Sequence, residues 1–283
     1  MDICAKILEG KDSRCPVSRR YLIVMFTPEQ PPRSISIPLP PNKCVVFISD
    51  VHLGLGPKIE DQHRERALVR LLQQVAVRAH HVFIVGDLFD FWFDWGTVIP
   101  KQHFRTLAAI AELLEGGVGV TYLMGNHDFG HHRFFREELG LTVDAGDVDV
   151  VIGKKRFYVS HGDGKANNDA GYRVLKSVLR NPVAQWLYRA IHPDWAVRLA
   201  SATSKGSRDH TGKKDYGEGD GLREFAARKI HSGYDFVIMG HRHKATVEHF
   251  DHGIYVNIGH WLGSEATYVE YSEHDGLRLL TVP

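Results

Sequence analysis

The chain has 283 residues, of which 43% are hydrophobic and 24% charged, and its formal net charge is +1. A chain of this length can bury the core of one catalytic domain, and its composition argues against a disordered or fibrous protein. A net charge near zero, without a Lys/Arg stripe interleaved with aromatic residues, argues against nucleic acid as a partner. The charge is uneven, because residues 165–215 hold ten Lys/Arg and four Asp/Glu, against 25 and 30 elsewhere. This basic segment is a candidate surface for an anion.

Cysteine usage and hydropathy predict a cytoplasmic protein. The three cysteines, Cys4, Cys15 and Cys44, are widely spaced and form no CxxC pair, which is typical of a reducing compartment. The longest apolar run near the start, residues 21–26, has six residues, whereas a membrane-spanning helix needs about twenty. This run is also shorter than the apolar core of an export signal, although two arginines precede it.

The first 42 residues differ in composition from the rest. Six prolines lie between residues 28 and 41, and proline removes backbone donors and favours extended or irregular structure. We therefore predict an irregular extension over residues 1–42 and a folded domain over residues 43–283.

From Cys44 onward, apolar runs of strand length alternate with longer amphipathic segments. The first half gives strands at 44–49, 81–85 and 120–124, with helices at 61–78 and 103–115. Two closely spaced strands follow at 148–152 and 156–160, as in a hairpin. Helical segments then occupy 170–202, interrupted at Pro193, and the last strands lie at 235–240, 244–250, 253–259, 266–272 and 277–282. This order predicts an α/β fold with two sheets flanked by helices, and a helical insertion over about 166–215.

Five short motifs carry polar residues directly after apolar strands. They are SDVHLG at 49–54, GDLFD at 86–90, GNHD at 125–128, SHGDG at 160–164 and GHRH at 240–243. Because the carboxyl ends of neighbouring strands in an α/β sheet open into one crevice, these residues are expected to converge. One such motif alone occurs by chance in many proteins, whereas five in order argue for a common site.

The motifs predict a site for two metal ions. Asp50, His52 and His243 are predicted to hold one ion and Asn126, His161 and His241 the other, with Asp87 bridging both. Oxygen and imidazole ligands without thiolate suit Mn, Fe, Zn or Mg. Two such ions can clamp a phosphoryl group and turn a shared water into a hydroxide nucleophile near neutral pH.

His127, beside a predicted ligand, is the expected proton donor or charge-stabilising residue, and Asp128 is expected to orient its ring. The predicted reaction is in-line attack of a metal-bridging hydroxide on phosphorus. A different class of function is a non-catalytic scaffold that binds metal and docks a partner through the insertion. The complete ligand set and His127 argue against that alternative.

The order DxH, GDxxD, GNHD, HGD, GHxH resembles the calcineurin-like metallophosphoesterase superfamily from Cys44 to about Trp261. The resemblance implies a four-layer αββα sandwich and the same metal ligands. The insertion sequences HGDGKANNDAGYRVLK at 161–176 and RNPVAQWLYRAIHPDW at 180–195 are similar to the UDP-2,3-diacylglucosamine pyrophosphatases of lipid A biosynthesis, as is GDLFDFWFDW at 86–95. Those enzymes release UMP and 2,3-diacylglucosamine 1-phosphate (lipid X), usually with manganese. Other phosphodiesterases or phosphatases of the superfamily are the alternative.

The narrower resemblance implies substrate contacts. Asp169 and Ser204 match positions that contact the substrate head group, and Arg208 stands where better-known members have asparagine. Asn126 and His241 are also assigned to substrate binding. His127 is a departure, because those members carry arginine there.

The insertion is the expected contact with a lipid substrate. It carries an apolar stripe of Val183, Trp186, Leu187, Ile191, Trp195 and Leu199, while nearby lysines and arginines supply positive charge. The resemblance implies peripheral attachment to the inner face of the cytoplasmic membrane through this insertion, and no protein partner is indicated. By periodicity alone, packing of the stripe onto the sandwich is the favoured alternative, and the specific resemblance of the insertion reverses that preference. Trp92 and Trp95 suit either an acyl channel or the core.

Overall fold

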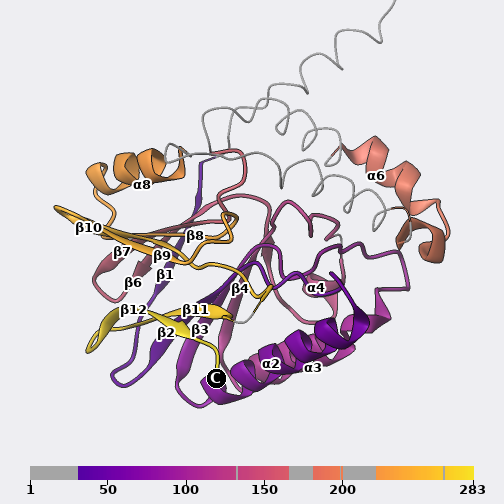
Figure 1. The fold of residues 1–283 in the computed structure, drawn as a ribbon, viewed down its shortest axis with the longest axis horizontal. Coiled ribbons are helices and arrows are strands. Elements are labelled where there is room, and N and C mark those ends of the chain that lie inside the picture. Colours follow the sequence, from indigo (N-terminus) through magenta and orange to yellow (C-terminus); the bar gives the residue numbers. More distant parts are fainter. Residues whose placement is uncertain (1–30, 132, 166–180, 198, 200–220, 264) are drawn as a thin grey trace, which may run out of the picture. The chain divides into compact units, whose positions relative to one another are not determined.

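The computed structural model describes residues 31–283 except 132, 166–180, 198, 200–220 and 264, and its strands form two six-stranded sheets (Figure 1). Sheet I has the order β1 (Arg33–Ile37), β6 (Val148–Ile152), β7 (Lys155–Ser160), β8 (Phe236–Met239), β10 (Gly253–Asn257), β9 (Thr246–Phe250). Sheet II has the order β12 (Gly276–Thr281), β11 (Thr267–Ser272), β2 (Cys44–Ile48), β3 (Ala79–Val85), β4 (Gly119–Leu123), β5 (Val143–Asp144). The strands predicted from the sequence are therefore confirmed.

Helices cover the outer faces of both sheets (Figure 1). The helices α2 (Lys58–Ala76) and α3 (Phe104–Glu115) pack on sheet II, and α8 (Leu222–His231) packs on sheet I. The short helix α4 (Phe134–Glu137) and the 3-10 helix η2 (Lys101–His103) lie in connections. With a third apolar cluster between the sheets, this arrangement confirms the predicted αββα architecture. Among the described helices, none has the length and hydropathy that a bilayer crossing requires.

The strand β2 shows why the two sheets sandwich a core. All five of its residues are buried, and alternate side chains point to opposite faces. Val45 and Phe47 enter the core between the sheets, whereas Val46 and Ile48 meet the helices. Phe47 is opposite Phe83 of β3, with ring centroids 5.0 Å apart. Truncation of a phenylalanine buried in this way costs about 3–5 kcal/mol of stability.

The helix α2 follows from the period of its apolar residues. Leu68, Leu71, Leu72 and Val75 are buried, and this spacing places them on one face of a helix. Lys58–Ala76 agrees with the predicted helix at 61–78 to within three residues at each end.

One prediction about the first 42 residues is wrong. Arg33–Ile37 is not irregular but forms β1, which pairs in parallel with β6. The strand lies at the edge of sheet I, where flanking prolines are tolerated because one side of the strand needs no ladder partner. Its Ile35 and Ile37 pack against the core between the sheets.

The described part of the insertion contains α6 (Pro182–Arg189). Asn181 begins this helix, because its side chain accepts hydrogen bonds from the N–H groups of Val183 and Ala184 at 2.9 and 3.4 Å. Tyr188 packs on Phe93 with ring centroids 4.9 Å apart. The helix is thereby attached to the loop that follows β3. Much of the predicted segment 166–215 lies outside the described residues.

Candidate metal centre

The polar motifs converge because five strands end at one edge of the sandwich. In sheet II, β2, β3 and β4 run parallel, and in sheet I β7 and β8 run parallel. Each carries one of the five motifs at its carboxyl end. Side chains separated by up to 193 residues, from Asp50 to His243, are therefore neighbours.

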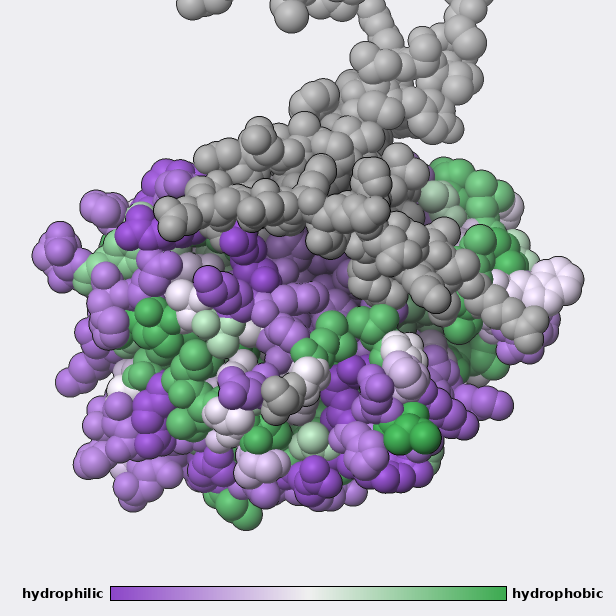
Figure 2. All heavy atoms as spheres, viewed as in Figure 1, coloured by the Kyte–Doolittle hydropathy of each residue, from purple (hydrophilic) through white to green (hydrophobic). Residues whose placement is uncertain are grey.

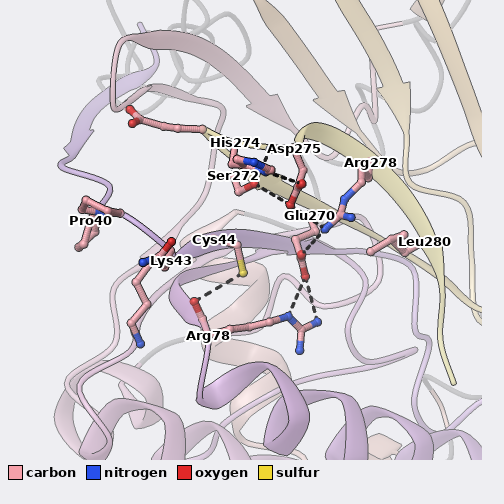
Figure 3. Close-up of a pocket in the computed structure, with 13 residues that line it drawn as sticks. Pro40, Lys43, Cys44, Arg78, Glu270, Ser272, His274, Asp275, Arg278 and Leu280 are labelled. Atoms are coloured by element: carbon pink, nitrogen blue, oxygen red, sulfur yellow. Dashed lines mark hydrogen bonds and ion pairs between the residues drawn. The ribbon is translucent and has the colours of Figure 1, made fainter.

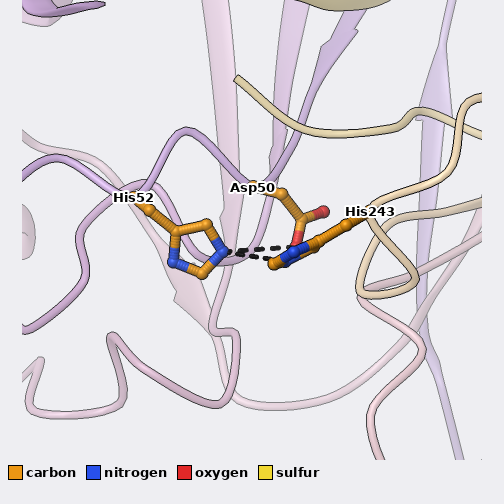
Figure 4. A group of neighbouring side chains, drawn as sticks. All are labelled: Asp50, His52 and His243. Atoms are coloured by element: carbon orange, nitrogen blue, oxygen red, sulfur yellow. Dashed lines mark hydrogen bonds and ion pairs between the residues drawn. The ribbon is translucent and has the colours of Figure 1, made fainter. Parts of the chain in front are cut away.

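The first group consists of Asp50, His52 and His243, whose donor atoms point toward one another (Figure 4). The Nε2 atoms of His52 and His243 are 3.0 Å apart. Asp50 Oδ1 lies 3.2 Å from Nε2 of His243 and 3.7 Å from Nε2 of His52. Three atoms that can each offer a lone pair and that converge in this way match the coordination that a divalent cation demands.

The second group lies beside the first and shares Asp87 with it. Asn126 Oδ1 is 3.0 Å from His161 Nε2 and 3.0 Å from His241 Nδ1. Asp87 Oδ2 is 3.3 Å from His161 Nε2 and 3.8 Å from His52 Nε2. This carboxylate therefore faces both groups, which is the position that a bridging ligand requires.

Hydrogen bonds fix which atom of each side chain faces the centre. Asp50 Oδ2 accepts hydrogen bonds from Ser49 Oγ at 2.5 Å and from the His241 N–H at 2.9 Å, so Oδ1 faces the first group. His161 Nδ1 lies 2.9 Å from the Val85 carbonyl oxygen. A carbonyl only accepts, so Nδ1 carries a proton, and Nε2 is the nitrogen at which a cation would take the place of a second proton.

Backbone strain is concentrated at the same residues. Among the described residues, six that are not glycine have a positive φ, and five of these are predicted ligands. They are Asp50 (51°), His52 (50°), Asp87 (52°), His241 (71°) and His243 (55°). A left-handed conformation costs an ordinary residue about 1–2 kcal/mol. Strain gathered at one place is typical of a functional site.

Two glycines allow the loops of the centre to lie close together. A Cβ atom at Gly125 would collide with Asp87, and one at Gly240 would collide with Ser49 and Asp50. Each glycine directly precedes a predicted ligand. The glycines of GNHD and GHRH are thus required by close packing at the centre.

The electrostatics of the centre favour bound cations. Burial by itself would raise the pKa of Asp50 and of Asp87, but the neighbouring imidazole rings outweigh it and hold both pKa values well below the ordinary range. Burial would lower the pKa of His161, yet the charges of Asp87 and Asp50 raise it well above normal. Burial and the charge of His161 lower the pKa of His241 to about 4, so its ring is neutral and able to coordinate at pH 7.

The prediction that Asp128 orients His127 is wrong. The Asp128 carboxylate accepts hydrogen bonds from the N–H groups of Gly125 and Leu88, both at 2.8 Å, and from the Tyr122 hydroxyl at 2.5 Å. It therefore ties together the loops that carry the ligands. The group that faces the His127 ring is Asp90, whose Oδ1 and carbonyl oxygen lie 3.5 and 3.3 Å from Nδ1.

His260 is a further histidine at the edge of the centre, outside the five motifs. It follows β10, which runs parallel to β8, and its ring centroid is 5.2 Å from that of His243. The signal was available, because GIYVNIGH is another apolar strand followed by glycine and histidine. Of the predicted substrate contacts, Asn126 and His241 are at the centre, whereas Asp169, Ser204 and Arg208 lie outside the described residues.

A cavity that the described residues form lies away from this centre. It has a volume of about 780 Å³ and lies at the amino end of β2, around Cys44 (Figure 3). Its buried Glu270 accepts hydrogen bonds from Arg78 at 2.9 and 3.0 Å and from Arg278 at 2.9 Å. These charges pair with one another, so the lining of the cavity is best explained as a structural ion network.

The chain matches proteins of known family along most of its length. The model of the calcineurin-like phosphoesterase family matches residues 45–245. A protein of Porphyromonas gingivalis named UDP-2,3-diacylglucosamine hydrolase is 32% identical over 254 residues, covering 83% of this chain and 95% of that relative. Relatives of the same name from Nitrosococcus oceani and Neisseria meningitidis are 30% and 28% identical, covering 72% and 77% of this chain and 80% and 90% of their own.

The match spans the five strand-end motifs and agrees with the fold described above. The predicted superfamily and enzyme class are therefore confirmed. The chain belongs to the calcineurin-like phosphoesterases and is a hydrolase of phosphoric ester or anhydride bonds.

Proposed function

We propose that the chain hydrolyses the pyrophosphate bond of UDP-2,3-diacylglucosamine and releases UMP and 2,3-diacylglucosamine 1-phosphate. The observation that carries this proposal is the attachment of helix α6 to the loop after Asp87, the residue that would bridge the two ions. Tyr188 of α6 packs on Phe93 and Phe91 of that loop, with ring centroids 4.9 and 6.1 Å apart. An apolar element beside a phosphoryl-binding centre suits an amphiphile whose phosphates and acyl chains need different surroundings.

The apolar stripe of the insertion supports the same substrate. Trp186 and Trp195 are 67% and 69% exposed, and Val183, Leu187 and Leu199 are also exposed. In Figure 2 apolar side chains gather around α6. The alternative that this stripe packs onto the sandwich does not account for such exposure. Contiguous exposed apolar side chains are typical of a surface that binds lipid or a partner.

Seven residues would hold two divalent ions, and their chemistry fits such ions. Asp50, His52 and His243 would hold one ion, and Asn126, His161 and His241 the other, with Asp87 between them. The donor set has imidazole, carboxylate and amide atoms without thiolate, which suits manganese and also Fe, Zn or Mg. When bound, the ions supply Lewis acidity at the phosphoryl group and activate the attacking water.

The protein's own residues would direct the proton transfer and the binding. His127 is held by Asp90 and is 20% exposed at its side chain, so its ring can reach a substrate from the edge of the centre. It would donate a proton or a hydrogen bond to the leaving oxygen as the P–O bond breaks. Asp169, Ser204 and Arg208 would contact the head group, as the resemblance of the insertion implies.

The experiment that tests this proposal is direct. Purified protein loaded with manganese is incubated with UDP-2,3-diacylglucosamine, and release of UMP is measured. UMP and the acylated sugar phosphate are expected in equal amounts. A metal-loaded protein that cleaves simple phosphodiesters but leaves this substrate intact would refute the proposed substrate and favour another phosphoesterase activity. Metal binding without turnover of either would favour a scaffold.

The exposed stripe further supports peripheral binding to a membrane surface. Cosedimentation with vesicles of anionic phospholipid measures this. Trp186→Ser is expected to weaken binding severalfold, because it removes an exposed indole from the stripe. Ile59→Ser is a matched control, since Ile59 is 71% exposed but lies on α2. Equal binding of both variants and the wild-type protein would contradict attachment through α6.

A further inference from the structure

The side chain of His260 lies at the edge of the metal centre without a role in the predicted ligand set. The chain segment that carries it is held firmly. The Asn257 amide donates to the Gly240 carbonyl oxygen at 2.6 Å, and the Trp261 N–H donates to the Asp50 carbonyl oxygen at 3.1 Å. Both flanks of His260 are therefore bonded to the loops that carry the ligands, so its ring has a fixed position relative to them.

Four imidazole rings form a row across the centre. Centroids are 5.0 Å apart from His127 to His52, 4.9 Å from His52 to His243, and 5.2 Å from His243 to His260. The two inner rings belong to the first ligand group. The two outer rings flank it, with His127 at one end and His260 at the other. His243 is 39% exposed at its side chain and His260 is partly exposed, so this end of the row is open to solvent.

His260 is not placed as a ligand. Among the described residues, no group of three ligand atoms within 4.8 Å of one another includes it. A hydrogen bond instead defines its tautomer, because the Leu262 N–H donates to His260 Nδ1 at 2.9 Å. Nδ1 must then carry the lone pair, and the proton of the neutral ring sits on Nε2. The neutral ring is thus a hydrogen-bond donor at Nε2.

We propose that His260 is a substrate-contacting residue whose Nε2–H donates a hydrogen bond to a non-bridging phosphoryl oxygen of the bound phosphate ester. This inference deepens the proposed phosphohydrolase function and rests on it. A phosphoryl group bound over the two inner histidines would lie between the outer pair. Fixed donors of this kind stabilise the charge that develops on phosphoryl oxygens without any cost of reorganisation.

Two substitutions separate the contact with substrate from a structural role. His260→Asn keeps an acceptor for the Leu262 N–H near the position of Nδ1, but it loses the donor at Nε2. His260→Gln places an amide N–H near the position of Nε2. The probe is inorganic phosphate, titrated calorimetrically into the manganese-loaded full chain, with bound manganese measured for each protein.

We expect His260→Asn to raise the Kd for phosphate about tenfold or more, and His260→Gln to stay within about threefold of wild type. Manganese content should be unchanged in both. Wild-type affinity in His260→Asn, or manganese loss in it, would overturn the proposal, as would a manganese-loaded wild-type protein that does not bind phosphate. If the wild-type protein releases no UMP but the His260→Asn defect is present, the lipid substrate is wrong and the role of His260 stands.

Discussion

Replacing Asp90 with asparagine removes the charge that faces the His127 ring and keeps the shape of the side chain. Asp90 Oδ1 lies 3.5 Å from His127 Nδ1. Two unit charges at that separation attract by about 5 kcal/mol at an effective dielectric constant of 20. The ring is 20% exposed, so solvent screening reduces this figure. We expect a loss of about 1.4–3 kcal/mol in transition-state stabilisation, or roughly 10- to 150-fold in kcat.

The assay is a double-mutant cycle on a simple substrate. The kcat for bis(p-nitrophenyl) phosphate with manganese is measured for the wild type, Asp90→Asn, His127→Ala and the double variant, together with bound metal. If Asp90 acts by positioning His127, its substitution has little further effect once His127 is absent. Asp94→Asn, in the same loop and buried, is the matched control. An equal loss from Asp90→Asn in both backgrounds would refute the reasoning.

Three further predictions concern the stability and loading of the protein. Gly240→Ala should weaken manganese binding at least tenfold in equilibrium dialysis, because its Cβ would meet Ser49 and Asp50, whereas Gly96→Ala, with open space around its Cβ, should bind normally. Removing the metal with a chelator should lower the free energy of unfolding by about 2.7 kcal/mol, compared with protein at a free metal concentration of 100 times Kd. Unchanged urea unfolding would contradict this. Burial lowers the pKa of His103 to about 3, so only the unfolded chain takes up that proton near pH 6. The contribution of His103 to stability should therefore be about 1.3 kcal/mol smaller at pH 5.5 than at pH 7.5. The variant His103→Phe should lack this part of the pH dependence of stability. An identical pH dependence in the variant and the wild-type protein would count against the role of His103.

Local patterns were sufficient for the strands that carry the five motifs and for the residues of the two ligand groups. The run CVVFI has the length and hydropathy of a strand buried on both faces, and it is β2. A motif that directly follows a strand lies at that strand's carboxyl end, whatever the sheet order. The seven predicted ligands therefore come together although the sequence does not define which strands are neighbours. The strand at Arg33–Ile37 escaped prediction because five residues between prolines carry too weak a pattern, and pairing with β6 stabilises them.

The sequence by itself determined the fold class, the residues of the two ligand groups and their convergence, because hydropathy alternation and the identity of polar residues at strand ends are local properties. Only the tertiary structure decided how the carboxylates divide their roles. Proximity along the chain favoured Asp128 for orienting His127, because it is the next residue. The pairing of β3 with β4 brings Asp90 to the ring and turns Asp128 toward backbone N–H groups. The run GIYVNIGH places His260 at a strand end, but its position beside His243 follows from the pairing of β10 with β8, which no local pattern encodes.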